Sequence, residues 1–319
     1  MRTGVPTFAE LPVRDGAPPE SSWGVFGDDD DLGTVNFLTS EHVRAAAGLV
    51  RRGATFSLNW DVSLPAPGFF MRHPPAHTMI EKFDGMVLDD WVDGFYLQGS
   101  TQWDGLRHFQ DPDHGFYNGA TLAEVSRPGP GKLGVEHLAE RTIVARGVLL
   151  DVVRVLARSG VELDPFDYFP IDDEVLVRTA AEEGVELRGG DILVVRTGWV
   201  EAYTALDGDA RARYADEGRP GSPGLAAAQS LPAFLWDTRI TAVAADNPAL
   251  EAAQPRLGAD LSLHKALIAR LGMPLGELWQ LGELAADCER DGIYEFLLTS
   301  APMNLAGGCG TPANAVAVK

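Results

Sequence analysis

The sequence is short of cysteine and of basic residues, and each shortage excludes a class of protein. Its two cysteines, Cys288 and Cys309, cannot form a disulfide framework or a cysteine-rich zinc site. With 46 acidic residues against 26 basic ones, the formal net charge is −20, and no basic stripe compensates for it. Nucleic acids and anionic membrane surfaces are therefore disfavoured as partners.

Long apolar runs are also missing. No segment reaches the roughly 18 continuous apolar residues that a membrane-spanning helix needs. The first residues, MRTGVPTFAELPVRDG, lack the apolar centre of a secretion signal. We therefore expect a cytoplasmic protein. The 319 residues contain no linker or repeat, so we expect one domain over residues 23–319, preceded by a surface arm over residues 1–22.

The usual motifs of nucleotide binding and of nucleophilic catalysis are absent or out of context. Gly129, Gly131 and Gly134 fit the spacing G-x-G-x-x-G, but no strand precedes them and prolines interrupt them, so we expect a surface loop. Neither a P-loop nor a G-x-S-x-G turn occurs. Cys309, in GGCGTP, has no histidine nearby in the sequence, which favours a small buried residue over a nucleophile.

Four consecutive aspartates, Asp28 to Asp31, raise the question of a calcium site. A calcium loop places its ligands at alternate positions and ends with a distal glutamate. The four aspartates lack both features. We expect a solvated turn.

Helical and strand-like patterns of apolar residues alternate along the chain. The patterns predict helices from Ser40, after residue 171, from Ser222 with Pro223 in the first helical position, and over 261–272. Strands are predicted over 142–156, up to Trp199, up to Asp246, over 292–303 and over 313–319. This alternation indicates an α/β protein with a mixed sheet.

The stretch YLQGSTQWDGLRHFQDPDH, residues 96–114, has an unusual order of polar side chains. Gln98, Gln102 and Asp104 are evenly spaced, so on a strand all three point to one face. Asp104 and His108 offer a carboxylate and an imidazole, a normal ligand pair for a divalent ion. A solvent-exposed sheet edge would show the same alternation. No H-E-x-x-H helix occurs, so any site must be assembled from distant segments.

The same stretch resembles the cyclase family of metal-dependent hydrolases, which includes bacterial kynurenine formamidase and isatin hydrolase. Their signature is H-x-G-T-H-x-D-x-x-x-H, and it aligns with Gln98, Ser100, Thr101, Gln102, Asp104 and His108. The similarity continues through GDILVVRTGW, AADNPAL and the closing SAPMNLAGGCGTPANAVAV. The family's later histidine and glutamate match His264 and Glu277. The resemblance implies a single-domain α/β fold of the swivelling β/β/α cyclase type.

Two signature histidines are replaced by amides, a pattern shared by longer family members with S-T-Q-W-D. The resemblance implies a divalent metal on Gln98, Gln102, Asp104 and His108. Amides are neutral oxygen donors that suit zinc poorly, so manganese, magnesium or calcium would also fit. Two other arrangements stay open. The ion could sit on Asp104, His108 and Glu277, or no metal is bound and His108, His264 and Glu277 form an acid–base set.

The activity that the resemblance implies is hydrolysis of an amide, lactam, lactone or similar cyclic carbonyl by metal-activated water. We expect His108, His264 and Glu277 to be catalytic, and His264 to carry protons. Aromatic residues near the stretch indicate an aromatic or apolar small molecule, with substrate contacts from Phe70, His77, Trp103 and Trp199. Two alternatives remain, a cyclase or dehydratase acting on a polyketide-like compound and a degenerate binding paralogue. The resemblance also implies a homodimer or a larger homo-oligomer.

Overall fold

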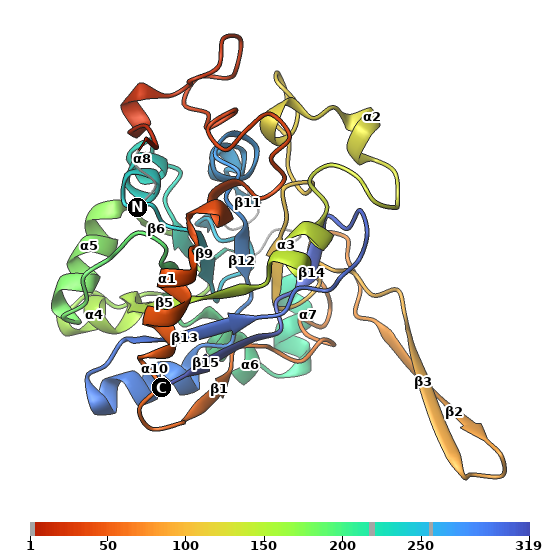
Figure 1. The fold of residues 1–319 in the computed structure, drawn as a ribbon. Coiled ribbons are helices and arrows are strands. Elements are labelled where there is room, and N and C mark those ends of the chain that lie inside the picture. Colours follow the sequence, from red (N-terminus) through yellow and green to blue (C-terminus); the bar gives the residue numbers. More distant parts are fainter. Residues whose placement is uncertain (1–3, 217–220, 255–257) are drawn as a thin grey trace.

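A nine-stranded mixed sheet runs through the molecule in the computed structural model, which describes residues 4–216, 221–254 and 258–319 (Figure 1). Four neighbouring strands in its middle are parallel, and antiparallel strands extend both sides. In spatial order the strands are β1 (Thr55–Ser57), β15 (Ala315–Val318), β13 (Glu295–Ser300), β5 (Ile143–Asp151), β7 (Ile192–Arg196), β9 (Ala242–Ala245), β12 (Leu275–Glu277), β4 (Gln102–Asp104) and β14 (Gly310–Pro312).

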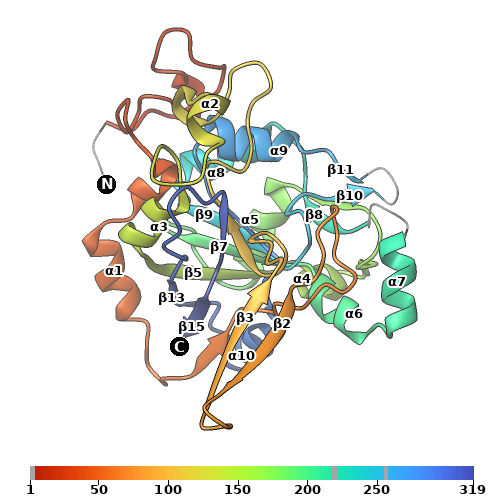
Figure 2. The same ribbon diagram turned by 90° about the vertical axis from the view of Figure 1, so that its right-hand side faces the viewer.

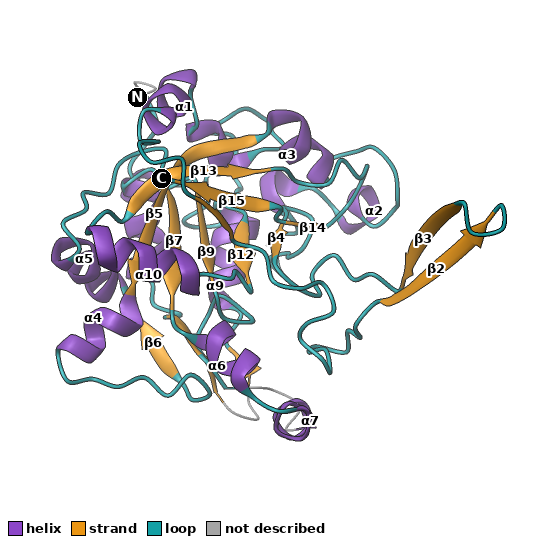
Figure 3. Cartoon of the chain, turned by 90° about the horizontal axis from the view of Figure 1, so that it is seen from below, coloured by secondary structure: helices purple, strands orange, loops and turns teal. Residues whose placement is uncertain are grey.

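Helices cover both faces of this sheet (Figure 3). They are α1 (Ser40–Ala47), α2 (Leu122–Val125), α3 (Val135–Arg141), α4 (Val152–Arg158), α5 (Asp173–Glu182), α6 (Trp199–Ala205), α7 (Gly208–Asp216), α8 (Ser230–Asp237), α9 (Ser262–His264) and α10 (Gly282–Asp291). Short 3-10 turns are η1 (Phe8–Glu10), η2 (Gly33–Phe37) and η3 (Tyr117–Gly119), and the π-helical turn η4 (Lys265–Arg270) continues α9.

The core is divided by the sheet into two apolar layers. Along β7, Leu193 and Val195 pack on the side of α5, α8 and η4, whereas Ile192 and Val194 pack on the side of α10. A parallel strand buried on both faces reads as a continuous apolar run, which is why ILVV was recognisable in the sequence. The predicted α/β fold with a mixed sheet is confirmed.

A long hairpin stands away from this body. Strands β2 (Ala76–Lys82) and β3 (Val87–Asp93) pair with each other alone and extend outward in Figures 1 and 3, and Figure 2 views the molecule from the hairpin's side. Every residue of β3 is exposed. Two further pairs are small, β6 (Phe169–Ile171) with β8 (Pro223–Leu225), and β10 (Ala253–Gln254) with β11 (Gly258–Ala259).

Two predicted elements differ from the structure. The strand expected over 142–156 ends at Asp151, because that side chain caps the helix α4 by accepting a hydrogen bond from the Arg154 N–H. The helix expected from Ser222 starts only at Ser230, with Pro232 in its first turn, where a missing N–H is tolerated. Residues 223–225 pair with β6 instead. A local helix cap accounts for the first difference and a tertiary strand pairing for the second.

The N-terminal segment packs along α8. The backbone N–H of Phe8 donates to Asp237 at 2.7 Å, and the Arg239 guanidinium donates to the Val5 carbonyl at 3.0 Å. Within the expected arm over 1–22, Phe8 joins the apolar core and Ser21 and Ser22 are buried, and residues 1–3 lie outside the described part. Among the described residues, no helix combines the length and the apolar character needed to cross a membrane.

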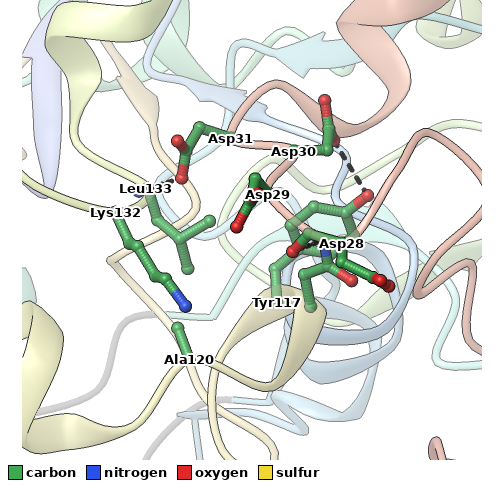
Figure 4. Close-up of a pocket in the computed structure, with 9 residues that line it drawn as sticks. Asp28, Asp29, Asp30, Asp31, Tyr117, Ala120, Lys132 and Leu133 are labelled. Carbon is green, nitrogen blue, oxygen red and sulfur yellow. Dashed lines mark hydrogen bonds between the residues drawn. The ribbon is translucent and has the colours of Figure 1, made fainter.

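The aspartates of Asp28–Asp31 border a small cavity of about 60 Å³ together with Tyr117 and Leu133 (Figure 4). Asp30 accepts a hydrogen bond from the Tyr117 hydroxyl at 3.1 Å, and burial raises the pKa of Asp30. Asp31 accepts one from the Leu133 N–H at 2.7 Å. These acids fasten the turn to two other segments, so it is more closely packed than the solvated turn we expected.

Candidate active site

The short strand β4 divides its side chains between the site and the core. Gln102 and Asp104 point to one face, because alternate residues of a strand do so. Glu277 of β12 lies directly opposite Gln102 in the antiparallel register. The Gln102 amide donates to the Glu277 carboxylate at 2.6 Å, and all three side chains are buried. One hydrogen-bonded strand pair thus joins residues 175 positions apart.

His264, on α9, completes a compact group with these acids. Its Nε2 lies 3.3 Å from Glu277 Oε1 and 3.8 Å from Asp104 Oδ2. One ligand atom each from Asp104, His264 and Glu277 falls within 4.8 Å of the others. The imidazole is only 3% exposed. The segments predicted to converge therefore meet in one buried cluster.

His108 lies at the more open side of this group. Its Nε2 is 3.7 Å from Asp104 Oδ1, and its side chain is 24% exposed. The His108 and His264 rings are 6.4 Å apart between centroids, and Phe109 packs against His264 at 5.6 Å. Asp104, His264 and Glu277 are buried, so within this group of four His108 is the residue that solvent can reach.

Burial and neighbouring charges give the carboxyl groups of Asp104 and Glu277 different pKa values. Burial, and then the charge of Asp104, raise the pKa of Glu277 to about 7. Burial alone would also raise the pKa of Asp104, but the charges of His108 and His264 outweigh it and leave that pKa lowered. Asp104 is therefore a carboxylate, while Glu277 is able to take up and release a proton near neutral pH.

The two histidines are also shifted in opposite directions. Burial lowers the pKa of His108, against the opposing charge of Asp104, so this imidazole is neutral at pH 7. Burial acts the same way on His264, but contacts with Asp104, Glu251 and Glu277 dominate and raise the pKa of His264 well above its usual value. A neutral imidazole beside a cationic one is an arrangement suited to base and acid roles.

The donor set fits a divalent cation. Both carboxylate oxygens of Asp104 and the Gln102 Oε1 are buried and accept no hydrogen bond from any residue that the structure describes. Buried acceptors normally have partners, and a cation would satisfy all three. An imidazole and carboxylates are ordinary ligands for manganese or zinc, and the amide oxygen suits manganese better than zinc. Asp104, Gln102 and His264 would hold such an ion, and Glu277 lies beside it as a group that exchanges a proton.

Comparison with known proteins places this site in a family. The family model described as "Putative cyclase" matches residues 61–252, more than half of the chain. A crystal structure of a novel cyclase is 36% identical and has a TM-score of 0.84, and the match covers 94% of this chain and 99% of that one. The chain belongs to the cyclase family. No curated protein matches it significantly.

More distant cyclase-like structures share the fold. Isatin hydrolase A from Labrenzia aggregata, bound to benzyl benzoate, is 18% identical, with a TM-score of 0.58 over 85% of this chain and 94% of that one. A predicted metal-dependent hydrolase from Bacillus stearothermophilus is 15% identical, with a TM-score of 0.51 over 84% and 98%. At this level of identity the likeness concerns the fold alone.

Gln98 does not lie on the strand face that its spacing in the sequence predicted. Strand β4 covers only Gln102–Asp104, so Gln98 lies outside it in the preceding turn. Its side-chain nitrogen lies against Gly310, and Gly310 pairs with Asp104 across β14. The expectation of a single strand face therefore holds for Gln102 and Asp104 and is wrong for Gln98.

Three of the four residues that we expected to contact the substrate do not fit that expectation. Trp103 and Trp199 are fully buried in the core and present no surface to a small molecule. His77 lies on the outward hairpin, where it pairs with Asp90 at 2.7 Å. Phe70 is 42% exposed and packs under the Arg72 guanidinium, so it keeps a face that a small molecule can reach.

Two residues of this site were not predicted from the sequence. Glu251 contacts the His264 ring at 3.0 Å, and the positive charge of Arg72 contributes to the lowered pKa of Asp104 and His108. Glu251 follows shortly after the end of β9, and acids after parallel strands often reach a site; Arg72 shows no such signal. Cys309, expected to be buried, is exposed.

Proposed function

We propose that this member of the cyclase family is a metal-dependent hydrolase that opens or cleaves an amide, lactam, lactone or similar cyclic carbonyl compound. The observation that carries the proposal is the buried group of Asp104, His264 and Glu277, with ligand atoms within 4.8 Å of one another. Acceptor oxygens that have no hydrogen-bond donor add support, because a cation is what such a group lacks. Family membership supports the same reaction class.

The pKa shifts of the site residues indicate a catalytic role for each of them. His108 is neutral and accessible, so it accepts a proton from the attacking water. Glu277, with a pKa of about 7, returns a proton to the leaving nitrogen or oxygen. As a ligand of a bound ion, His264 would be neutral, holding the ion through Nε2 while its Nδ1–H is donated to Glu251. A bound divalent ion would supply Lewis acidity and lower the pKa of water.

The substrate class is to be decided by a panel of carbonyl compounds. Cyclic amides such as isatin, open-chain N-formyl anilines, aromatic lactones and simple esters separate C–N from C–O cleavage. Phe70, the exposed aromatic residue beside Arg72, favours aromatic members of the panel. Turnover of none of these compounds by the metal-loaded protein, with binding of several, would instead support a binding paralogue.

Asp104→Ala is expected to abolish metal binding. Residues that only support a ligand typically contribute ~10- to 100-fold in metal affinity, so loss of a ligand oxygen should weaken binding by more than ~100-fold. The measurement is elemental analysis of protein purified without chelator, followed by calorimetric titration with manganese and zinc. Asp113→Ala, an exposed neighbouring acid, is the matched control and should bind like wild type. A wild type that carries no metal and gains neither stability nor activity from either ion would refute the metal assignment.

We also propose that the protein forms a homodimer or larger homo-oligomer through the β2–β3 hairpin. An isolated two-stranded hairpin is marginally stable in water and needs a covering surface. Large apolar side chains of this hairpin are instead exposed, by 40% to 82%, namely Met79, Phe83, Met86, Val87, Leu88, Trp91 and Val92. Such a patch on a soluble protein is typical of an interface.

The double variant Leu88→Asp with Trp91→Asp is expected to convert the assembled protein into monomers. Two carboxylates would have to be buried without partners in the contact, which costs several kcal/mol (about 4 kcal/mol is ~1000-fold in the association constant). Light scattering at micromolar concentration measures the change. The control Leu122→Asp places one carboxylate on α2, at a residue that is 60% exposed. It should leave the mass of the assembly, as measured by light scattering, unchanged. A strictly monomeric wild type would contradict the proposal.

A further inference from the structure

We propose that Glu251 is a positioning residue that sets the orientation of the His264 imidazole and reserves its Nε2 for the site. The proposal deepens the function proposed above, because His264 matters chemically only if that site is the catalytic one. Glu251 itself touches neither Asp104 nor Glu277 in any hydrogen bond found among the described residues. Its role is therefore exerted through His264.

One carboxylate oxygen of Glu251 holds residue 264 at two points. Oε1 accepts a short hydrogen bond from the backbone N–H of His264 and lies 3.0 Å from its ring Nδ1. Because a carboxylate only accepts, the ring nitrogen at this contact carries the proton. The backbone contact fixes where the side chain starts, and the ring contact fixes how the imidazole is turned.

The opposite ring nitrogen is directed at the acids as a consequence. With Nδ1 held by Glu251, Nε2 faces Glu277 Oε1 at 3.3 Å and Asp104 Oδ2 at 3.8 Å. A flipped ring would direct a carbon atom at these oxygens. A carboxylate behind a histidine is the usual way in which a protein fixes the tautomer and orientation of a ligand imidazole.

Glu251 is itself held by rigid surroundings, which a positioning residue requires. It is 1% exposed, and its backbone carbonyl accepts a hydrogen bond from the Asn247 amide at 3.1 Å. The residue also bridges to Leu225 at the end of β8, and the flanking Leu250 and Ala252 backbones bond to the same Leu225. The carboxylate is thus presented from a fixed backbone and not from a free loop.

The test compares Glu251→Ala, Glu251→Gln and wild type by ¹⁵N-edited NMR of histidine-labelled, metal-free protein. Wild type is expected to show a protected Nδ1–H proton on His264, and Glu251→Ala is expected to lose it. Glu251→Gln keeps an acceptor oxygen and should retain the proton. In calorimetric titration with zinc, Glu251→Ala should bind ~10- to 100-fold more weakly than wild type, and Glu251→Gln should recover most of the loss.

Glu183→Ala is the matched control. Glu183 is also a buried carboxylate that accepts a backbone N–H, in its case from Asp151 at 2.9 Å, so its loss costs stability without touching His264. Retention of a protected His264 proton in Glu251→Ala, or its absence in wild type, would overturn the proposal. If wild type binds neither zinc nor manganese, the proposed metal function fails, while the ring-proton comparison still decides the role of Glu251.

Discussion

His264→Ala is expected to lower kcat/KM by at least ~100-fold on any carbonyl substrate that the wild type turns over, because removal of a positioned acid or base usually costs ~100- to 10,000-fold. The variant should still fold, which circular dichroism will show, since it keeps the backbone hydrogen bond from residue 264 to Glu251. Glu277→Gln should cause a similar loss. It keeps the shape of the side chain but cannot titrate near pH 7.

His137→Ala serves as the control for both variants. His137 is a half-buried histidine on α3 that contacts the Gly131 carbonyl at 3.0 Å. The kcat/KM of His137→Ala should be close to that of wild type. Full activity of His264→Ala and Glu277→Gln would mean that the chemistry takes place elsewhere. The cyclase relationship would then describe the fold and not the site.

Trp103→Ala is expected to lower the free energy of unfolding by ~3–5 kcal/mol, the usual cost of truncating a buried tryptophan. Trp103 is fully buried, packs edge-on against Trp279 with ring centroids 4.9 Å apart, and donates its indole N–H to Ser300 at 2.9 Å. The loss would therefore combine a cavity with a broken buried hydrogen bond. Urea unfolding followed by far-ultraviolet circular dichroism measures it.

The same denaturation experiment on Leu122→Ala gives the baseline. That side chain is 60% exposed, so its truncation should change stability by about 0.5 kcal/mol or less. Trp103→Phe should lie between the two, because it fills most of the volume but cannot donate to Ser300. Equal stability of Trp103→Ala and wild type would contradict the core role that the structure gives this residue.

The sequence was informative where residue spacing and local pattern determine structure. Alternation around Gln102 and Asp104 correctly indicated one face, and buried parallel strands such as β7 were legible as apolar runs. That His264 and Glu277 would join them was known only from the resemblance to the cyclase family. No local pattern reveals that β12 pairs with β4 in the register that sets Glu277 opposite Gln102.

Predictions from the sequence were wrong where contacts between residues far apart in the chain determine the structure. Trp103 and Trp199 were expected at the substrate because aromatic residues suit both cores and pockets, and only the packing of the folded chain distinguishes these uses. Residues 223–225 form a strand because β6 is available as a partner. Glu251 was missed for the same reason, since its importance comes from one contact with a residue 13 positions later.

The position of β4 in the sheet has a consequence for how the protein matures. Both neighbours of this strand come from far later in the chain, β12 at Leu275–Glu277 and β14 at Gly310–Pro312. During synthesis, Gln102–Asp104 therefore has no sheet partners until β12 and β14 have been made. The group of Asp104, His264 and Glu277 cannot assemble before β12 has been made, so any ion it holds is acquired after that point. A fragment that ends before β12 would contain Asp104 and lack a site.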